Sequence, residues 1–451
     1  MKSILIKNGT VATSKGVTFS DILVSDGKIK KIDQDIEPGD SETEIIDASN
    51  YIVFPGGIDP HVHMELPVGN GIVSTDDFES GSRAAIAGGT TTFIDFVTPT
   101  RGQSLVEALH ERKELAANSL CHWKLHASVT EWYDGLPDDL KYCREKEGIN
   151  SVKVYMAYKN TIGLNDTEIL KVMKIAAELD MMVLVHCEDG DMIETFREKL
   201  LSEGKKIPYF HPFSRPPEAE VDAVRRAVDM AKKAGCRLYI VHISTKEALE
   251  IVNEAKSQGL PVYAEVCIHH LLLDDRKYRE SELEGAMYVM SPPLRKRSDC
   301  EALWNGLRYG AVDTVATDHC PFNLKGQKDK GIDDFTLVPN GVPGIQHRMG
   351  LLYQFGVREG RIPLEKFVEV TSTRAAELFG FSAKGTIAEG SDADLVLWNP
   401  QVSDTIHAST HFHNCDYSIY EKFKISGKPV WIFCSNGVFS SPTKKIRKKK
   451  K

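Results

Sequence analysis

Six side chains that can bind a metal ion lie at or next to the ends of short apolar segments. Four of these segments are rich in β-branched residues, which favours buried strands. In an α/β barrel the carboxyl ends of the strands meet on one face, so ligands that are far apart in the sequence converge there. The pattern therefore favours a metal-dependent hydrolase. The six residues are His61, His63, Lys153, His186, His242 and Asp318.

Four of the six are histidines. His61 and His63 are separated by one residue, so both imidazoles lie on the same side of an extended strand. Residues 55–60, just before them, contain two prolines and two glycines, which allow a sharp bend at a strand end. His186 and His242 each follow four apolar residues. A buried core histidine would explain either one alone, but it explains the whole set poorly.

Asp318 and Lys153 would complete such a site. A carboxylate at the end of a buried strand is costly unless it is paired or bound to a metal, and it can also move a proton. We interpret the neighbouring His319 as structural. A strand lysine such as Lys153 cannot bind a metal while protonated, but reaction with carbon dioxide would give a carbamate that can bridge two ions. A solvent-facing lysine is the alternative.

The middle of the chain alternates strand-like and helix-like segments, which is typical of a parallel sheet. Eight predicted strands fit a closed (β/α)8 barrel, a TIM-like α/β fold, better than an open sheet. No Gly-x-Gly-x-x-Gly follows a strand, which argues against a dinucleotide-binding fold. We assign the barrel to residues 55–381. Its strands are expected at residues 52–59, 91–96, 124–129, 151–155, 182–186, 237–242, 262–266 and 314–318, with helices at 166–179, 218–234 and 245–258 among those between them.

Each end of the chain has short strands with tight turns, but too few strands to close a core alone. We therefore expect one small β-sandwich domain built from residues 1–54 and 382–440. Asn8-Gly9 and Asp26-Gly27 are strong hairpin signals. Seven of the last eight residues are basic, so residues 441–451 are expected to be a disordered tail. The strands are expected at residues 4–7, 21–25, 28–33, 44–47, 394–398 and 429–434.

Composition excludes several other classes of protein. With 451 residues, 41% hydrophobic and 27% charged, the chain is typical of a globular protein, and a net charge of −8 gives no reason to expect a nucleic-acid partner. The nine cysteines are dispersed without Cys-x-x-Cys, which argues against a disulfide framework and for a reducing compartment. No apolar segment suits a signal peptide or a membrane span, so we expect a cytoplasmic protein without a membrane partner.

With these residues assembled, the chain resembles the amidohydrolase superfamily and, within it, the dihydropyrimidinase and hydantoinase family. The resemblance implies two Zn²⁺ ions per subunit, bridged by N6-carboxylated Lys153 and a hydroxide. His61, His63, Lys153 and Asp318 would hold one ion, and Lys153, His186 and His242 the other. The similar motifs are residues 56–63, 153–159, 291–295 and 316–322.

The resemblance also implies roles for four residues around the substrate. Tyr158 would bind the substrate and stabilise the oxyanion, and Ser291 and Asn340 would hold the ring amide through backbone groups. Asp318 would act first as general base and then as general acid. The implied reaction opens dihydrouracil, dihydrothymine or a hydantoin to an N-carbamoyl amino acid. The implied partners are a small cyclic amide and further copies of the chain in a homotetramer.

Three alternatives to a dihydropyrimidinase differ in how well the sequence supports them. A D-hydantoinase that prefers bulky 5-substituted hydantoins is the first. A dihydroorotase is disfavoured, because Met64-Glu65 stands where that enzyme has an arginine two residues after the histidine pair. A non-catalytic scaffold homologue would have lost metal ligands, and none is missing. Residues 407–425 could reach a neighbouring subunit, with His411 and His413 at a surface or an interface.

Overall fold

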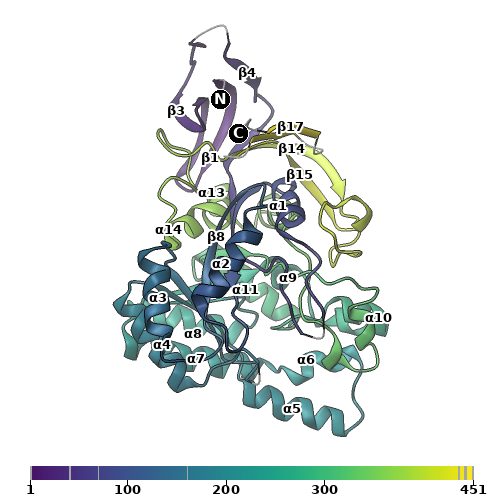
Figure 1. The fold of residues 1–451 in the computed structure, drawn as a ribbon. Coiled ribbons are helices and arrows are strands. Elements are labelled where there is room, and N and C mark those ends of the chain that lie inside the picture. Colours follow the sequence, from purple (N-terminus) through teal and green to yellow (C-terminus); the bar gives the residue numbers. More distant parts are fainter. Residues whose placement is uncertain are drawn as a thin grey trace.

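The computed structural model describes residues 3–39, 42–69, 71–159, 161–434, 437–440 and 444–448. They form an α/β barrel and, above it in Figure 1, a sheet that contains strands from both ends of the chain. None of the helices among these residues has the length and apolar character needed to cross a membrane. The predicted combination of a barrel with a composite terminal domain is confirmed.

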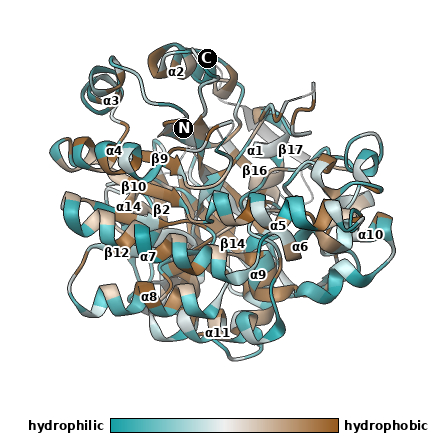
Figure 2. Ribbon diagram, turned by 90° about the horizontal axis from the view of Figure 1, so that it is seen from below, coloured by the Kyte–Doolittle hydropathy of each residue, from teal (hydrophilic) through white to brown (hydrophobic). Residues whose placement is uncertain are grey.

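The barrel consists of eight parallel strands that follow one another in chain order. Their residues are almost all buried, because helices cover the outside and side chains fill the inside. Figure 2 shows this arrangement, with apolar strands surrounded by helices whose outer faces are polar. The strands are β6 (Gly57–Val62), β7 (Thr90–Val97), β8 (His122–Ser128), β9 (Ser151–Tyr155), β10 (Met182–His186), β11 (Arg237–Ile240), β12 (Val262–Cys267) and β13 (Thr314–Ala316).

The helices between the strands begin and end at residues suited to capping. Capping boxes at Asp77, Ser104 and Asn165 satisfy exposed backbone N–H groups, and left-handed Gly235 and Gly310 end two further helices. The three predicted helices named above are confirmed to within one residue at each end. The longer helices are α1 (Phe78–Ala87), α2 (Leu105–Ala116), α3 (Leu136–Glu145), α4 (Asp166–Glu178), α5 (Gly190–Ser202), α7 (Pro217–Ala234), α8 (Lys246–Ser257) and α11 (Arg297–Tyr309).

The shorter helices lie mainly in the loops at the barrel ends and in the last third of the chain. They are α6 (His211–Ser214), α9 (Ile268–Leu272), α10 (Glu282–Met287), α12 (Arg348–Leu352), α13 (Leu364–Val368) and α14 (Arg374–Leu378).

A buried arginine closes the barrel between its first strand, β6, and its last, β13. Arg348 is fully buried, and its Nη1 donates hydrogen bonds of 2.8 Å to the carbonyls of Ile58 on β6 and Val315 on β13. The Asp59 carboxylate lies 3.9 Å from the Arg348 Nε, and its Oδ2 accepts a 2.6 Å hydrogen bond from the Thr317 hydroxyl. The strands β6 and β13 do not pair through a continuous ladder of backbone hydrogen bonds. Side-chain hydrogen bonds therefore connect them and close the barrel.

Replacing Arg348 by methionine is expected to destabilise the fold strongly. The substitution leaves two buried carbonyls without this donor and the Asp59 carboxylate without its cation, a loss that typically costs about 3–5 kcal/mol. Urea denaturation followed by circular dichroism measures the effect. Arg361→Met is the control, because Arg361 is partly exposed and its ion pair with Glu301 is worth at most about 1 kcal/mol. Equal urea midpoints for the two variants would contradict a closing role for Arg348.

The terminal strands form one mixed sheet, whereas the sequence predicted a sandwich. The connection is β5, which pairs in parallel with β1 and antiparallel with β14, so that the C-terminal strands extend the N-terminal sheet instead of packing over it. The strands are β1 (Ile4–Thr13), β2 (Gly16–Ser25), β3 (Lys28–Asp33), β4 (Glu44–Asp47), β5 (Ile52–Pro55), β14 (Leu395–Thr405), β15 (Lys424–Cys434), β16 (Gly437–Ser440) and β17 (Lys444–Lys448).

Two local predictions in this region were wrong. The expected barrel strand over residues 52–59 is broken at Gly56, with β5 in the composite sheet and β6 in the barrel. A Cβ atom on Gly56 would lie 2.0 Å from the Thr91 hydroxyl oxygen, so only glycine fits here. Asn8-Gly9 is a bulge within β1 (Asn8 φ 62°) and not a turn, because β1 and β2 stay paired on both sides of it. Asp26-Gly27 does form the turn between β2 and β3.

The basic tail also differs in part from the prediction of disorder. Residues 444–448 form β17, which pairs antiparallel with β16 at the edge of the composite sheet. The remaining tail residues, 441–443 and 449–451, lie outside the described residues.

Candidate metal centre

The structure brings His61, His63 and Asp318 together at the carboxyl end of the barrel. The Nε2 atom of His61 lies 3.2 Å from the Asp318 Oδ1, and the Nε2 atom of His63 lies 3.1 Å from the same oxygen. His61 is almost fully buried, whereas the side chains of His63 and Asp318 are 12% and 19% exposed. The group is therefore accessible from the side of His63 and Asp318.

His186 and His242 form a second pair beside this group. The Nδ1 atom of His186 lies 3.0 Å from the Nε2 atom of His242. The His242 ring stacks on His61 with a centroid separation of 5.5 Å, so the two groups are contiguous. Five of the six residues predicted to bind metal thus have ligand atoms directed at one another.

Two of these residues lie just beyond the strands in which the sequence placed them. Strand β11 ends at Ile240 and β13 at Ala316, and the backbone is left-handed at His242 (φ 40°) and Asp318 (φ 49°). Positive φ is uncommon for residues other than glycine and costs on the order of 1–3 kcal/mol, and such residues cluster at functional sites. At these bends Asp318 lies against His61 and His63, and His242 lies against His186.

Two buried carboxylates orient the histidines. The Glu265 Oε1 accepts a 2.7 Å hydrogen bond from the His61 Nδ1, and the Glu188 Oε2 accepts a 2.9 Å bond from the His186 Nε2. When each ring is neutral, its other nitrogen carries a lone pair. In His61 that nitrogen is Nε2 and faces Asp318, and in His186 it is Nδ1 and faces His242. Hydrogen bonds that metal-binding histidines donate to carboxylates fix the rings in the same way. Sequence analysis missed both glutamates.

The charge states suit a cation between these groups. Burial lowers the pKa of His63, His186 and His242 and so favours neutral imidazoles. Burial alone would raise the pKa of Asp318, but His61 and His63 hold it well below its usual range. Zn–N bonds of about 2.0–2.1 Å in a tetrahedral site place two ligand nitrogens about 3.3 Å apart. The N–N separation of 3.0 Å between His186 and His242 and the N–O separations of 3.1 and 3.2 Å to Asp318 are close to that value.

Lys153 lies in the same part of the barrel and is 1% exposed. Its Nζ is 5.4 Å from the centroid of Phe96, and that ring stacks on His63 at 4.7 Å. Within the described part of the chain, no hydrogen bond or ion pair neutralises the amine. Burial lowers the pKa of Lys153 to about 8, so about a tenth of the amine is neutral and nucleophilic at pH 7, far more than for an ordinary lysine. That state suits reaction with carbon dioxide.

The three residues predicted to bind substrate form a chain of contacts beside the histidines. The Ser291 Oγ donates a 2.8 Å hydrogen bond to the Asn340 Oδ1, and the Tyr158 hydroxyl lies close to the Ser291 side chain. The Tyr158 ring lies between His186, at 5.2 Å, and the Arg215 guanidinium, at 5.2 Å. Burial raises the pKa of Tyr158, so its hydroxyl remains a proton donor. Sequence analysis did not single out Arg215, which also forms an ion pair with Glu188.

His319, which the sequence suggested to be structural, is fully buried and bonded on both sides of its ring. Its Nε2 lies 3.0 Å from the Asp76 Oδ2, and its Nδ1 accepts a 3.0 Å hydrogen bond from the Gly344 N–H. With both nitrogens engaged, His319 has no lone pair to offer a metal.

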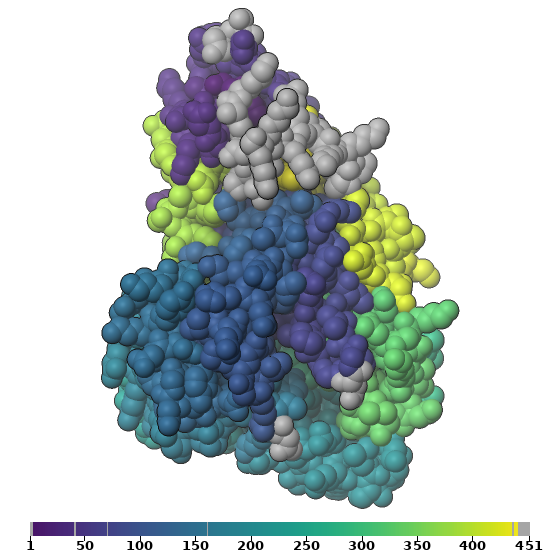
Figure 3. All heavy atoms as spheres, viewed as in Figure 1, coloured from purple at the N-terminus to yellow at the C-terminus, as the bar shows by residue number. Residues whose placement is uncertain are grey.

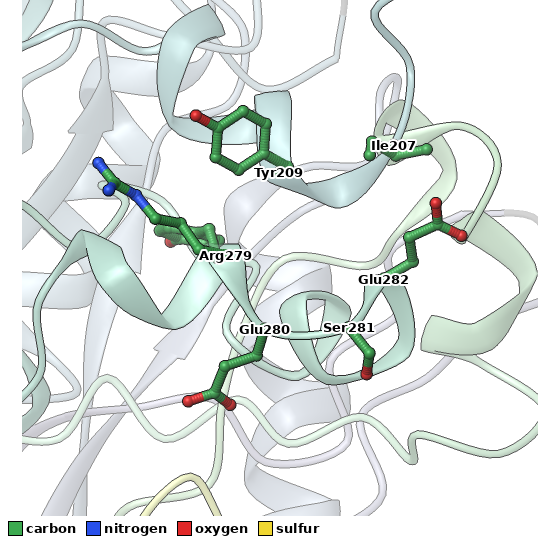
Figure 4. A pocket seen from close by; sticks show the side chains of 7 residues that line it. Ile207, Tyr209, Arg279, Glu280, Ser281 and Glu282 are labelled. Carbon is green, nitrogen blue, oxygen red and sulfur yellow. The ribbon is translucent and has the colours of Figure 1, made fainter.

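A surface hollow of about 750 Å³ lies apart from these residues, between a 3₁₀ turn, η1 (Pro208–Phe210), and the segment before α10. Figure 4 shows Tyr209, Arg279 and Glu282 among the residues that line it. It contains none of the predicted site residues, so its shape gives no information about the metal centre.

Comparison with known proteins agrees with this geometry. The amidohydrolase family model matches residues 52–432. A D-hydantoinase of Geobacillus stearothermophilus is 43% identical over 432 residues, which cover 95% of this chain and 91% of that protein. A dihydropyrimidinase of Dictyostelium discoideum is 38% identical over 446 residues, covering 98% and 88%. The crystal structure of dihydropyrimidinase from Brevibacillus agri matches with a TM-score of 0.95 and 41% identity, covering 97% and 95%.

A barrel with this constellation at its carboxyl end, matched along most of its length, defines an amidohydrolase. Within that class the chain belongs to the dihydropyrimidinase and D-hydantoinase family, and it is a cyclic-amide hydrolase of that type.

Proposed function

We propose that this enzyme opens the ring amide of dihydrouracil, dihydrothymine and hydantoins, giving N-carbamoyl amino acids, and that it uses two Zn²⁺ ions to do so. The supporting observation is the convergence of four imidazoles and the Asp318 carboxylate, with Tyr158 packed on His186 and Ser291 bonded to Asn340. The same convergence disfavours a non-catalytic scaffold. We also propose, from the family resemblance, a cytoplasmic homotetramer.

The donor set divides into two groups that share Lys153. His61, His63 and Asp318 would hold one ion, His186 and His242 the other, and carboxylated Lys153 would contact both. Bound at these residues, the two ions would supply an activated water and polarise the amide carbonyl. A carbamate on Lys153 would add the negative charge that the second group otherwise lacks, because its two histidines are neutral.

The protein side chains position the substrate and move the proton. Asp318 accepts a proton from the attacking water and returns it to the leaving ring nitrogen, acting as general base and then as general acid. The Tyr158 hydroxyl donates a hydrogen bond to the carbonyl oxygen as negative charge develops on it. Backbone groups of Ser291 and Asn340 hold the ring amide, and the Ser291–Asn340 bond keeps their two loops together.

Replacing Tyr158 by phenylalanine is expected to lower kcat by about 10²–10³-fold, as for other single oxyanion donors. KM should change little, because the hydrogen bond strengthens only as charge develops. Steady-state ring opening of dihydrouracil measures both constants. Tyr142→Phe, on the outer helix α3, is the matched control. A Tyr158→Phe enzyme with wild-type kcat would remove Tyr158 from the mechanism.

The preferred substrate is tested by comparing dihydrouracil, dihydrothymine and 5-phenylhydantoin under steady-state conditions with zinc-loaded enzyme. A higher kcat/KM for the dihydropyrimidines would support the dihydropyrimidinase assignment, and a higher value for the phenylhydantoin would support the D-hydantoinase alternative. No ring opening of any of the three would contradict the proposed function.

A further inference from the structure

A second group of histidines lies outside the catalytic centre, where residues 411–413 meet the barrel. His347, just before α12, and His411 and His413 of the C-terminal segment each offer one ring nitrogen, and these nitrogens lie within 4.8 Å of one another. The His411 and His413 rings are only 3.5 Å apart between centroids. The sequence favoured a surface or interface position for His413, but its side chain is 4% exposed within a single subunit.

Several buried nitrogens in this group lack partners. Among the described residues, neither ring nitrogen of His413 has a hydrogen-bond partner. The Nε2 of His347 has none there either. The Nδ1 of His411 also lacks a hydrogen-bond partner among these residues. The other ring nitrogen, Nε2, donates a 2.6 Å hydrogen bond to the Cys415 carbonyl. That bond fixes the tautomer that leaves a lone pair on Nδ1. Buried polar atoms in native proteins are normally satisfied, so this cluster requires an explanation.

We propose that His347, His411 and His413 bind a further Zn²⁺ ion that ties the C-terminal segment to the barrel. Imidazole nitrogen is a preferred zinc ligand, and three histidines plus a water complete a tetrahedral site. The nitrogens need to approach by at most about 1.5 Å to reach the roughly 3.3 Å separation of tetrahedral zinc ligands.

This site is separate from the catalytic one. His319 lies between them, with its ring 5.9 Å from that of His413, and both of its nitrogens are already bonded. The segment that carries His411 and His413 is held to the barrel by two further hydrogen bonds, from the Phe412 N–H to Gln346 and from the Asn414 N–H to Asp76. Figure 3 shows this yellow C-terminal part lying against the barrel. Zinc here would therefore stabilise the docked segment without contacting substrate.

Metal analysis of the purified enzyme tests the proposal. After dialysis against buffer with trace zinc, the wild type is expected to hold one more zinc equivalent per subunit than His413→Gln, with equal dihydrouracil turnover. His407→Gln is the matched control, because His407 is exposed in the same segment and bonds Glu421 instead. The control should keep the wild-type zinc content.

A second measurement covers the case in which His413→Gln fails to fold. Anomalous diffraction at the zinc edge from wild-type crystals should show a peak between the three rings, apart from any peaks at the catalytic residues. No peak there, or equal zinc content in folded wild type and His413→Gln, would overturn the proposal. Either result is independent of whether the catalytic assignment is correct, since that assignment rests on other residues.

Discussion

Asp318→Asn is expected to lose turnover by about 10²–10⁴-fold while retaining its metal ions, the range typical of a general acid–base group. Asparagine has the shape of aspartate and keeps one oxygen to face His61 and His63, but it cannot accept and return a proton. Steady-state kinetics and zinc analysis on the same preparation separate the two effects. The left-handed backbone at residue 318 favours asparagine over other replacements, so the fold should survive.

Asp333→Asn is the matched control, since this aspartate is exposed on a neighbouring loop. It should have wild-type kcat and zinc content. If Asp318→Asn also turned over at the wild-type rate, Asp318 would have no role in proton transfer. If it lost zinc together with activity, its main contribution would be as a ligand.

Lys153→Ala is expected to lose about two zinc equivalents relative to wild type, with activity below detection, because no carbamate can form to join the two groups of ligands. Removing the side chain also leaves a space that a small carboxylate can enter. Acetate or propionate in the buffer should therefore restore part of both the zinc content and the turnover. Such chemical rescue distinguishes a bridging carboxylate from a lysine with a packing role.

Lys124→Ala provides the control for Lys153→Ala. Lys124 also lies on a barrel strand, but its Nζ donates a 3.0 Å hydrogen bond to the Phe379 carbonyl, away from the histidines. Its loss should leave zinc content unchanged. Full zinc content in Lys153→Ala without added carboxylate would show that Lys153 is not a metal ligand.

The barrel strands were predictable because they are buried on both faces. The bounds of β9 and β10 were predicted correctly. The prediction failed where the determining contact is made by a residue distant in sequence. The contact with Thr91 makes glycine necessary at residue 56, and the pairing of β5 with β14 joins the terminal strands into one sheet.

The residues of the candidate site were likewise predictable only in part. Its histidines stand out because a polar residue at the end of an apolar strand is unusual, and the structure brings them together. Glu265 lies inside an apolar strand in the same way as Lys153, so the signal used for the lysine could also have found it. His347 and His413 could not be paired from the sequence, because only the docking of the C-terminal segment places them side by side.

The pairing of β5 with strands from both ends has a consequence for synthesis on the ribosome. While β6–β13 are being translated, β5 can already pair with β1, but β14 has not yet been made. The edge of β5 that later pairs with β14 therefore stays exposed in the partly formed sheet. An open edge invites pairing with other chains. Newly made molecules are thus expected to be most prone to aggregation until the final part of the polypeptide emerges and covers that edge.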